Sequence, residues 1–104
     1  MRILLVDPPG KNKGFNTGLA YISAILKENH EVNVLDLNNI EIGVCGEPNI
    51  DMPIDEIETR IINAVDEFEP GLFGVSVKTF TSKISKHIFN FMHAQRPEIS
   101  TVAG

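Results

Sequence analysis

The stretch Ile3-Leu4-Leu5-Val6-Asp7-Pro8-Pro9-Gly10 decides the fold class of this chain. Four consecutive apolar residues that end at a Pro-Pro-Gly breaker are typical of a strand buried on both faces of a parallel sheet. After a loop over residues 8–16, Thr17 can cap a helix. The inward stripe of this helix is expected to hold Leu19, Ile22, Ile25 and Leu26. A buried strand followed by an amphipathic helix predicts an α/β protein.

The same alternation continues along the chain. Residues 32–36, 72–77 and 100–103 have the composition of further strands, and residues 54–68 form the clearest amphipathic helix pattern. A third helix, capped by Thr81 or Ser82, ends before Pro97. Right-handed crossovers then predict a Rossmann-like (flavodoxin-like) three-layer sandwich with a parallel sheet in the order 2-1-3-4. We expect one domain over residues 1–104, truncated after its fourth strand and belonging to a longer protein.

Composition excludes several classes of protein. A net charge of -5 argues against a nucleic-acid binder, because such proteins need clustered Lys and Arg. Cys45 is the only cysteine, so this chain cannot form a disulfide, a Cys-rich zinc site or a complete iron-sulfur cluster by itself. The four apolar residues of the opening run are fewer than the roughly 7 to 15 of a signal peptide. We therefore expect a cytoplasmic protein with no membrane partner.

A ligand is expected at the carboxyl edge of the sheet, where the parallel strands end. In open α/β sheets ligands bind at the switch point of the strand order, which here lies between the first and third strands. The predicted edge comprises residues 7–16, residues 76–82 and whatever follows Ala103-Gly104. Its most suggestive cluster is hydroxyl-rich: Ser76, Thr79, Thr81 and Ser82. Helix capping accounts for one or two of these hydroxyls, and a polar ligand is the alternative for the rest.

Well-known site motifs are missing at this edge. The glycines at positions 10, 14 and 18 match neither a dinucleotide-binding fingerprint nor a phosphate loop. Asp7 could be a ligand or base, or could accept hydrogen bonds from loop amides. A receiver domain is excluded because the third strand ends in Ser76-Val77-Lys78-Thr79, without an aspartate. His87 and His93 point to different faces of one helix, so no metal site is expected. Cys45 is not expected to be a nucleophile.

Five short segments follow one another in a recognisable order: residues 2–9, 17–26, 30–36, 70–79 and 102–104. They comprise a strand ending in Asp-Pro-Pro, a helix, a second strand, a third strand with a Ser/Thr loop, and the start of a glycine pair. This layout resembles the N-terminal cobalamin (B12)-binding domain of B12-dependent radical SAM enzymes. The resemblance spans nearly the whole chain.

The resemblance implies a cofactor site without a cobalt ligand. B12 domains of the methionine synthase type carry D-x-H-x-x-G after the first strand, whereas this chain has Pro9 at the histidine position. Binding would thus be base-off and histidine-off. Pro8, Pro9 and Gly10 would face the lower corrin surface, with Asn16 in the same predicted set. Ser76, Thr79 and Thr81 would bond the nucleotide tail or the corrin amides, and Gly104 would line the tail.

The resemblance also implies a larger enzyme. Radical chemistry needs a C-x-x-x-C-x-x-C motif in a following barrel domain, so S-adenosylmethionine and the 4Fe-4S cluster would belong to the parent protein. This chain would then bind cobalamin for a downstream radical SAM domain, in methyl transfer or related chemistry, and would not be an enzyme alone. Two alternatives stay open: the nucleotide- or nucleotide-sugar-binding half of a Rossmann-like transferase, with Lys11 and Lys13 meeting phosphates, and a regulatory domain that has lost its ligand.

Overall fold

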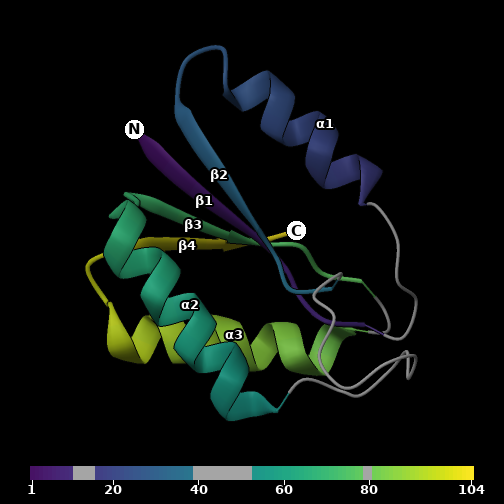
Figure 1. Ribbon diagram of the computed structural model, residues 1–104, viewed down its shortest axis with the longest axis vertical. Coiled ribbons are helices and arrows are strands. Elements are labelled where there is room, and N and C mark those ends of the chain that lie inside the picture. The colour runs from purple at the N-terminus through teal and green to yellow at the C-terminus, as the bar shows by residue number, and fades with distance from the viewer. Residues whose placement is uncertain (11–15, 39–52, 79–80) are drawn as a thin grey trace, which may run out of the picture.

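Four parallel strands form the centre of the molecule (Figure 1). The computed structural model describes residues 1–10, 16–38, 53–78 and 81–104. The strands are β1 (Arg2–Asp7), β2 (Glu31–Asp36), β3 (Leu72–Val75) and β4 (Ser100–Ala103), and the helices are α1 (Thr17–Leu26), α2 (Ile54–Phe68) and α3 (Ser82–Gln95). The strand order is β2-β1-β3-β4, and all pairings are parallel. The predicted α/β fold and strand order are therefore confirmed.

The helices cover the two faces of the sheet unequally. Helix α1 lies on one face, and α2 and α3 lie side by side on the other (Figure 1). Leu4 and Val6 of β1 belong to the core under α2 and α3, whereas Ile3 and Leu5 pack with Leu19 of α1. Alternate residues of a strand point to opposite faces, so the apolar run of β1 supplies both cores. This arrangement gives the three layers.

Helix α2 follows its sequence pattern closely. It buries Ile57, Ile61 and Val65, which recur at a spacing of four residues. Asp55 and Glu56 occupy its first turn, where carboxylates are stabilised by the helix dipole. Its C-cap, Glu69, has a φ of 52°, a left-handed conformation that ends the helix before the Pro-Gly pair. None of the described helices is long and apolar enough to cross a membrane.

Helix α1 is rotated relative to the expectation from sequence. Ile22 and Ile25, predicted to point inward, are each 50% exposed, while Ser23 is buried at 5%. Leu19 and Ser23 share the buried face because they are four residues apart. The predicted inward stripe was wrong at the two isoleucines, which instead leave an apolar outer face on α1.

Candidate functional site

The carboxyl edge brings together the predicted segments that follow β1, β3 and β4. The backbone N–H of Ser76 donates to the carbonyl of Val6 at 3.0 Å, so Ser76 continues the pairing of β3 with β1. Gly104 N–H donates to the Val75 carbonyl at 3.1 Å, and Val77 N–H donates to the Gly104 carbonyl at 2.8 Å. The chain around Ser76 and Gly104 is thus fixed by the sheet, although β3 itself ends two residues earlier than predicted.

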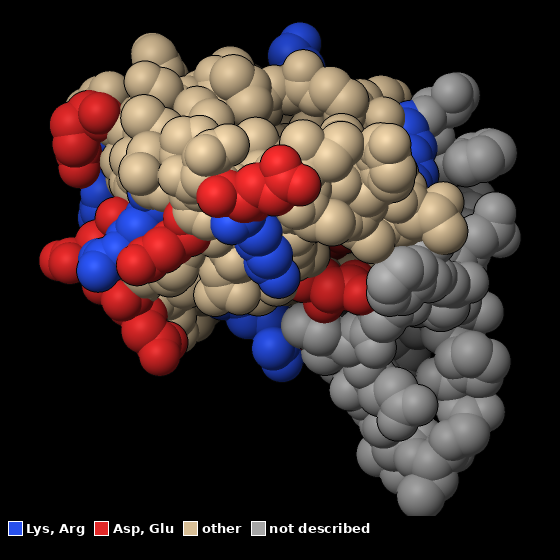
Figure 2. All heavy atoms as spheres, turned by 90° about the horizontal axis from the view of Figure 1, so that it is seen from above, with Lys and Arg blue, Asp and Glu red and all other residues tan. Residues whose placement is uncertain are grey.

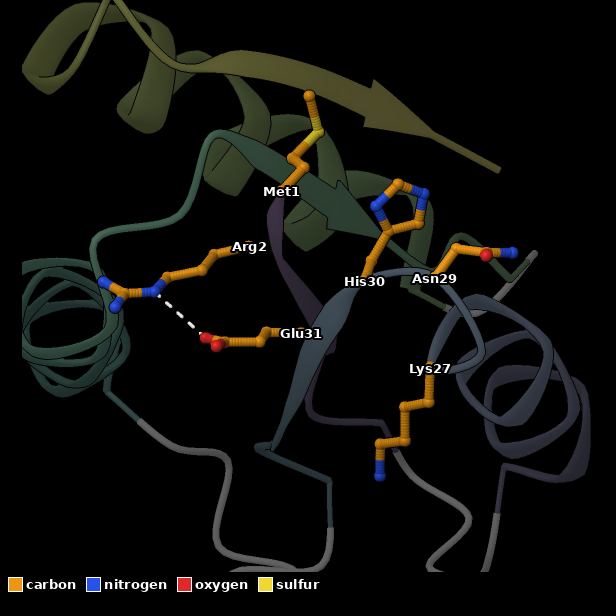
Figure 3. Close-up of a pocket in the computed structure, with 6 residues that line it drawn as sticks. All are labelled: Met1, Arg2, Lys27, Asn29, His30 and Glu31. Atoms are coloured by element: carbon orange, nitrogen blue, oxygen red, sulfur yellow. Dashed lines mark hydrogen bonds and ion pairs between the residues drawn. The ribbon is translucent and has the colours of Figure 1, made fainter.

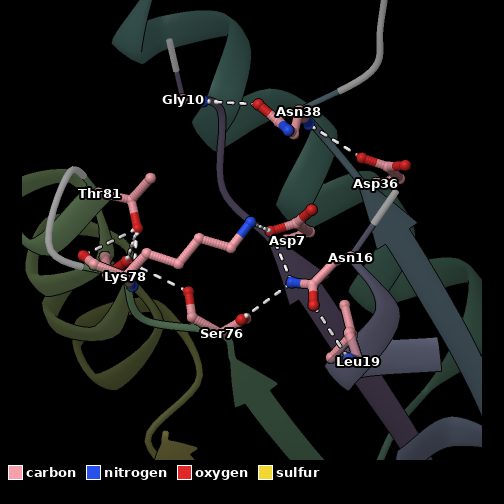
Figure 4. Close-up of polar contacts among 10 residues, drawn as sticks. Asp7, Gly10, Asn16, Leu19, Asp36, Asn38, Ser76, Lys78 and Thr81 are labelled. Atoms are coloured by element: carbon pink, nitrogen blue, oxygen red, sulfur yellow. Dashed lines mark hydrogen bonds and ion pairs between the residues drawn. The ribbon is translucent and has the colours of Figure 1, made fainter. Parts of the chain in front are cut away.

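Asn16 joins helix α1 to this edge. Its side-chain Oδ1 accepts the Leu19 N–H at 3.0 Å, so Asn16 is the N-cap of α1. The expectation that Thr17 caps the helix was wrong, because Thr17 is the first helical residue. The Nδ2 atom of Asn16 donates to Asp7 Oδ1 at 3.2 Å and to Ser76 Oγ at 3.1 Å (Figure 4). One amide therefore connects α1, β1 and the segment after β3.

Asp7 is a buried carboxylate in the middle of the edge. Its side chain is 2% exposed, and its Oδ1 lies 3.7 Å from Lys78 Nζ. Its Oδ2 has no hydrogen-bond partner among the residues that the structure describes. The sequence left open whether Asp7 accepts hydrogen bonds from loop amides. In the described residues its hydrogen-bond donor is the Asn16 side chain and not a backbone amide of the loop. Lys78 partly balances the charge of Asp7.

The loop after β1 is attached to the end of β2. The Gly10 N–H donates to Asn38 Oδ1 at 2.8 Å. Pro8 is fully buried, whereas Pro9 and Gly10 are half-buried, so only the latter two present surface at the edge. A Cβ on Gly10 would lie 3.2 Å from Thr81 Cγ2, a close approach that favours glycine. Sequence reasoning missed Asn38, although an asparagine directly after a strand at this edge is a usable signal.

Thr81 is occupied by its own turn. It is 3% exposed, and its Oγ1 accepts the Lys78 N–H at 3.0 Å. The same hydroxyl lies 3.3 Å from the Lys78 carbonyl, to which it can donate. Of the two expected caps, Thr81 does stand at the N-cap position of α3, but it makes no side-chain capping bond, and Ser82 is already helical. Thr79 lies outside the described residues.

An open apolar strip lies next to the carboxyl edge, on the face of the sheet that carries α1. Leu5, Gly74 and Val102 lie in one register row across β1, β3 and β4, and we call these three residues the apolar strip. Leu5 packs under α1, but Val102 is 49% exposed. Gly74 has no side chain, and a Cβ there would lie 2.8 Å from Leu5 Cδ2. The half of this face over β3 and β4 thus offers a shallow apolar floor.

A hollow at the opposite, amino-terminal edge does not form a comparable site. It has a volume of about 500 Å³ and is lined by Met1, Arg2, Lys27, Asn29, His30 and Glu31. Arg2 extends toward α2, donating to Glu31 at 3.1 Å and to the Phe68 carbonyl at 3.3 Å. Lys27 points away from His30 (Figure 3). The two cationic side chains of the hollow, Arg2 and Lys27, therefore point in different directions and do not converge on a ligand.

Charged residues in the described part of the chain give no further site. On the face in Figure 2, the Lys and Arg side chains are separated by acidic and uncharged ones. No three His, Cys, Asp or Glu side chains of the described residues are grouped to hold a metal ion. His87 lies 3.2 Å from Glu58, between α3 and α2. Cys45, Lys11 and Lys13 lie outside the described part of the chain.

No family model, curated protein or solved structure matches this chain.

Proposed function

We propose that this domain binds cobalamin in a base-off, histidine-off form, with the corrin ring on the carboxyl edge and the nucleotide tail along the apolar strip. The observation that carries the proposal is the continuity of these two surfaces. The polar edge lies at the switch point between β1 and β3, where α/β sheets bind ligands. The apolar strip lies beside it, because Gly74 precedes Ser76 by two residues and alternate residues of a strand share a face. A planar ring with a long aromatic tail needs such a pair of surfaces.

The absence of a nearby histidine supports the histidine-off form. Pro9 occupies the position of the histidine ligand of other B12 domains and is half-buried at the edge. Of the three histidines, all within the described residues, His30 lies at the amino-terminal edge, while His87 and His93 lie on α3. Pro9 and Gly10 would instead offer cobalt an apolar floor with no ligand atom.

In this proposal the chain supplies binding and orientation, and a following domain supplies the chemistry. The cluster and S-adenosylmethionine would be held by a downstream radical SAM domain of the same protein. Cobalamin, when bound, supplies methyl transfer or related radical chemistry at its cobalt. The accessible residues of the described edge that are expected to touch it are Pro9, Gly10, Ser76 and Gly104. Asn16 holds the supporting structure, and Thr81 is too deeply buried to contact it.

Mixing the protein with hydroxocobalamin, followed by gel filtration and a visible spectrum, tests the proposal. We expect the cofactor to co-elute and, after reduction to cob(II)alamin, to give an electron paramagnetic resonance spectrum without splitting from an axial nitrogen. A Gly74→Val variant, which fills the apolar strip, should retain less cofactor than a Gly71→Ala variant at the amino-terminal end of β3, where an added Cβ meets the Met1 side chain in ordinary contact at 3.5 Å. If no corrinoid is retained while a nucleotide sugar raises the melting temperature, the transferase alternative replaces this one.

A further inference from the structure

We propose that Asn16 is a positioning residue that makes the Ser76 hydroxyl a hydrogen-bond donor toward the ligand. The ligand group held there is then a neutral oxygen acceptor, such as the carbonyl of a primary carboxamide. This inference rests on the proposed function, because corrin rings carry several such carboxamides. It assigns to Asn16 a role that does not require contact with the ligand.

The orientation of the Asn16 amide is fixed from two sides. The Leu19 backbone N–H can only donate, so the atom that faces it at 3.0 Å is the oxygen. An ionised Asp7 can only accept, so the atom that faces it at 3.2 Å is the nitrogen. Both constraints agree, and a flipped amide would break both contacts.

The fixed amide determines what Ser76 can do. Asn16 Nδ2 donates its second hydrogen to Ser76 Oγ at 3.1 Å. This contact occupies a lone pair of the hydroxyl and leaves the hydroxyl hydrogen available. No acceptor for that hydrogen is found within residues 1–10, 16–38, 53–78 and 81–104. Ser76 lies beside Asn16 and is half-buried at the edge (Figure 4), which leaves its hydrogen available to a bound acceptor.

The charges around Ser76 favour a neutral acceptor. Asp7 is the acidic group that shares Asn16 with Ser76, and its Oδ2 has unfilled acceptor capacity. Lys78 lies 3.7 Å from Asp7 Oδ1 and offsets this charge. The pair sums to no net charge, so the part of the edge that the structure describes around Ser76 offers no surplus of positive charge for an anion. A carbonyl oxygen satisfies the donor without adding a charge beside a buried carboxylate.

Affinity measurements test the consequence for the ligand. Asn16→Ser keeps a residue that can cap α1 but removes the amide, and Ser76→Ala removes the donor. Each should weaken hydroxocobalamin binding by roughly tenfold, the effect of losing one hydrogen bond. Thr17→Ala, at the exposed first residue of α1, should bind as the wild type does. Equal binding by all four proteins overturns the inference while leaving cobalamin binding intact.

Dicyanocobinamide separates two sources of the acceptor. It keeps the corrin carboxamides but lacks the phosphodiester and base of the tail. The same loss in Ser76→Ala for both corrinoids places the acceptor on the corrin. A loss seen only with cobalamin places the acceptor on the nucleotide tail and overturns its assignment to a corrin carboxamide.

A measurement without cobalamin keeps the inference testable if the proposed function fails. In ¹⁵N-labelled protein, Ser76→Ala should move one of the two side-chain amide protons of Asn16 upfield, and an unchanged pair overturns the positioning role. Propionamide at millimolar concentration should shift the Gly104 amide signal of the wild type but not of Ser76→Ala. Retention of the propionamide shift in Ser76→Ala removes the assignment of Ser76 as the donor. Failure of hydroxocobalamin to bind the wild type overturns the proposed function alone.

Discussion

Replacing Asn16 by alanine removes three hydrogen bonds that meet at one side chain. The Leu19 N–H loses its acceptor at the first turn of α1, and Asp7 and Ser76 lose a common donor. Thr17→Ala is the matched control, because Thr17 is the neighbouring exposed residue and makes no capping bond. Comparing the stabilities of the two variants shows whether Asn16 joins α1 to the sheet.

The expected loss of stability follows from the burial of these groups. Loss of an N-cap costs about 1 kcal/mol. Loss of a hydrogen bond to a charged group costs about 1.5 to 3 kcal/mol. Asp7 is 2% exposed, so water replaces this donor poorly, and the half-exposed Lys78 at 3.7 Å compensates only in part. The sum is about 3 kcal/mol, or a fall in Tm of roughly 12 to 24 °C for a domain of this size.

Urea and thermal unfolding followed by circular dichroism measure this loss. Thr17→Ala should change the free energy of unfolding by less than about 0.5 kcal/mol. An Asn16→Ala protein as stable as the wild type, or one no less stable than Thr17→Ala, refutes the assignment of Asn16 as the cap and as the partner of Asp7. Loss of stability with an unchanged slope against urea indicates that the native contacts, and not the unfolded state, were altered.

Three further predictions use the same unfolding assay. Ile61→Ala should cost about 2 to 5 kcal/mol because Ile61 is fully buried, whereas Ile25→Ala should cost less than about 1 kcal/mol because half of that side chain is exposed; equal costs would restore the inward stripe expected from sequence. Thr81→Val should cost about 1 to 3 kcal/mol by leaving the Lys78 N–H without its acceptor, and a neutral result would free Thr81 for a ligand role. Gly74→Ala should cost about 1 kcal/mol, since the added Cβ would lie 2.8 Å from a side chain of β1 that must shift, and a stabilised variant contradicts this tight packing.

The layout of the sheet could be predicted from sequence because it depends on strong local signals. The apolar run of β1 is long enough for a strand buried on both faces, and its Pro-Pro-Gly ending marks the turn. The apolar spacing of α2 matches its buried face. Once helices alternate with strands, the handedness of the crossovers leaves few possible strand orders. These signals do not depend on which side chains meet at the carboxyl edge.

The rotation of α1 could not be predicted, because its sequence is apolar on more than one face. Leu19 is buried while Ile22 and Ile25 are exposed, and all three would satisfy a helical stripe. Asn16 helps to select which face of α1 is buried. It caps the helix and its side chain donates to Asp7, so it fixes where the helix starts relative to the sheet. That bond joins residues from different elements and has no signal in the local pattern. Tertiary contacts of this kind override periodicity.

The hydroxyl cluster after β3 illustrates how the structure narrows a compositional hint. From the sequence, Ser76, Thr79 and Thr81 were expected to contact the ligand, and Thr81 or Ser82 to cap α3. In the structure the Thr81 hydroxyl accepts the Lys78 N–H within its own turn, and Ser82 is the first residue of α3. Ser76 alone among the described hydroxyls of this cluster is half-buried at the switch point and held by a fixed amide. Among the described hydroxyls, Ser76 is therefore the one that we propose for a polar ligand at the carboxyl edge, with Asn16 and Asp7 behind it. In the proposal, specificity at this edge depends on the direction of the hydrogen bond from Ser76 more than on the number of hydroxyls.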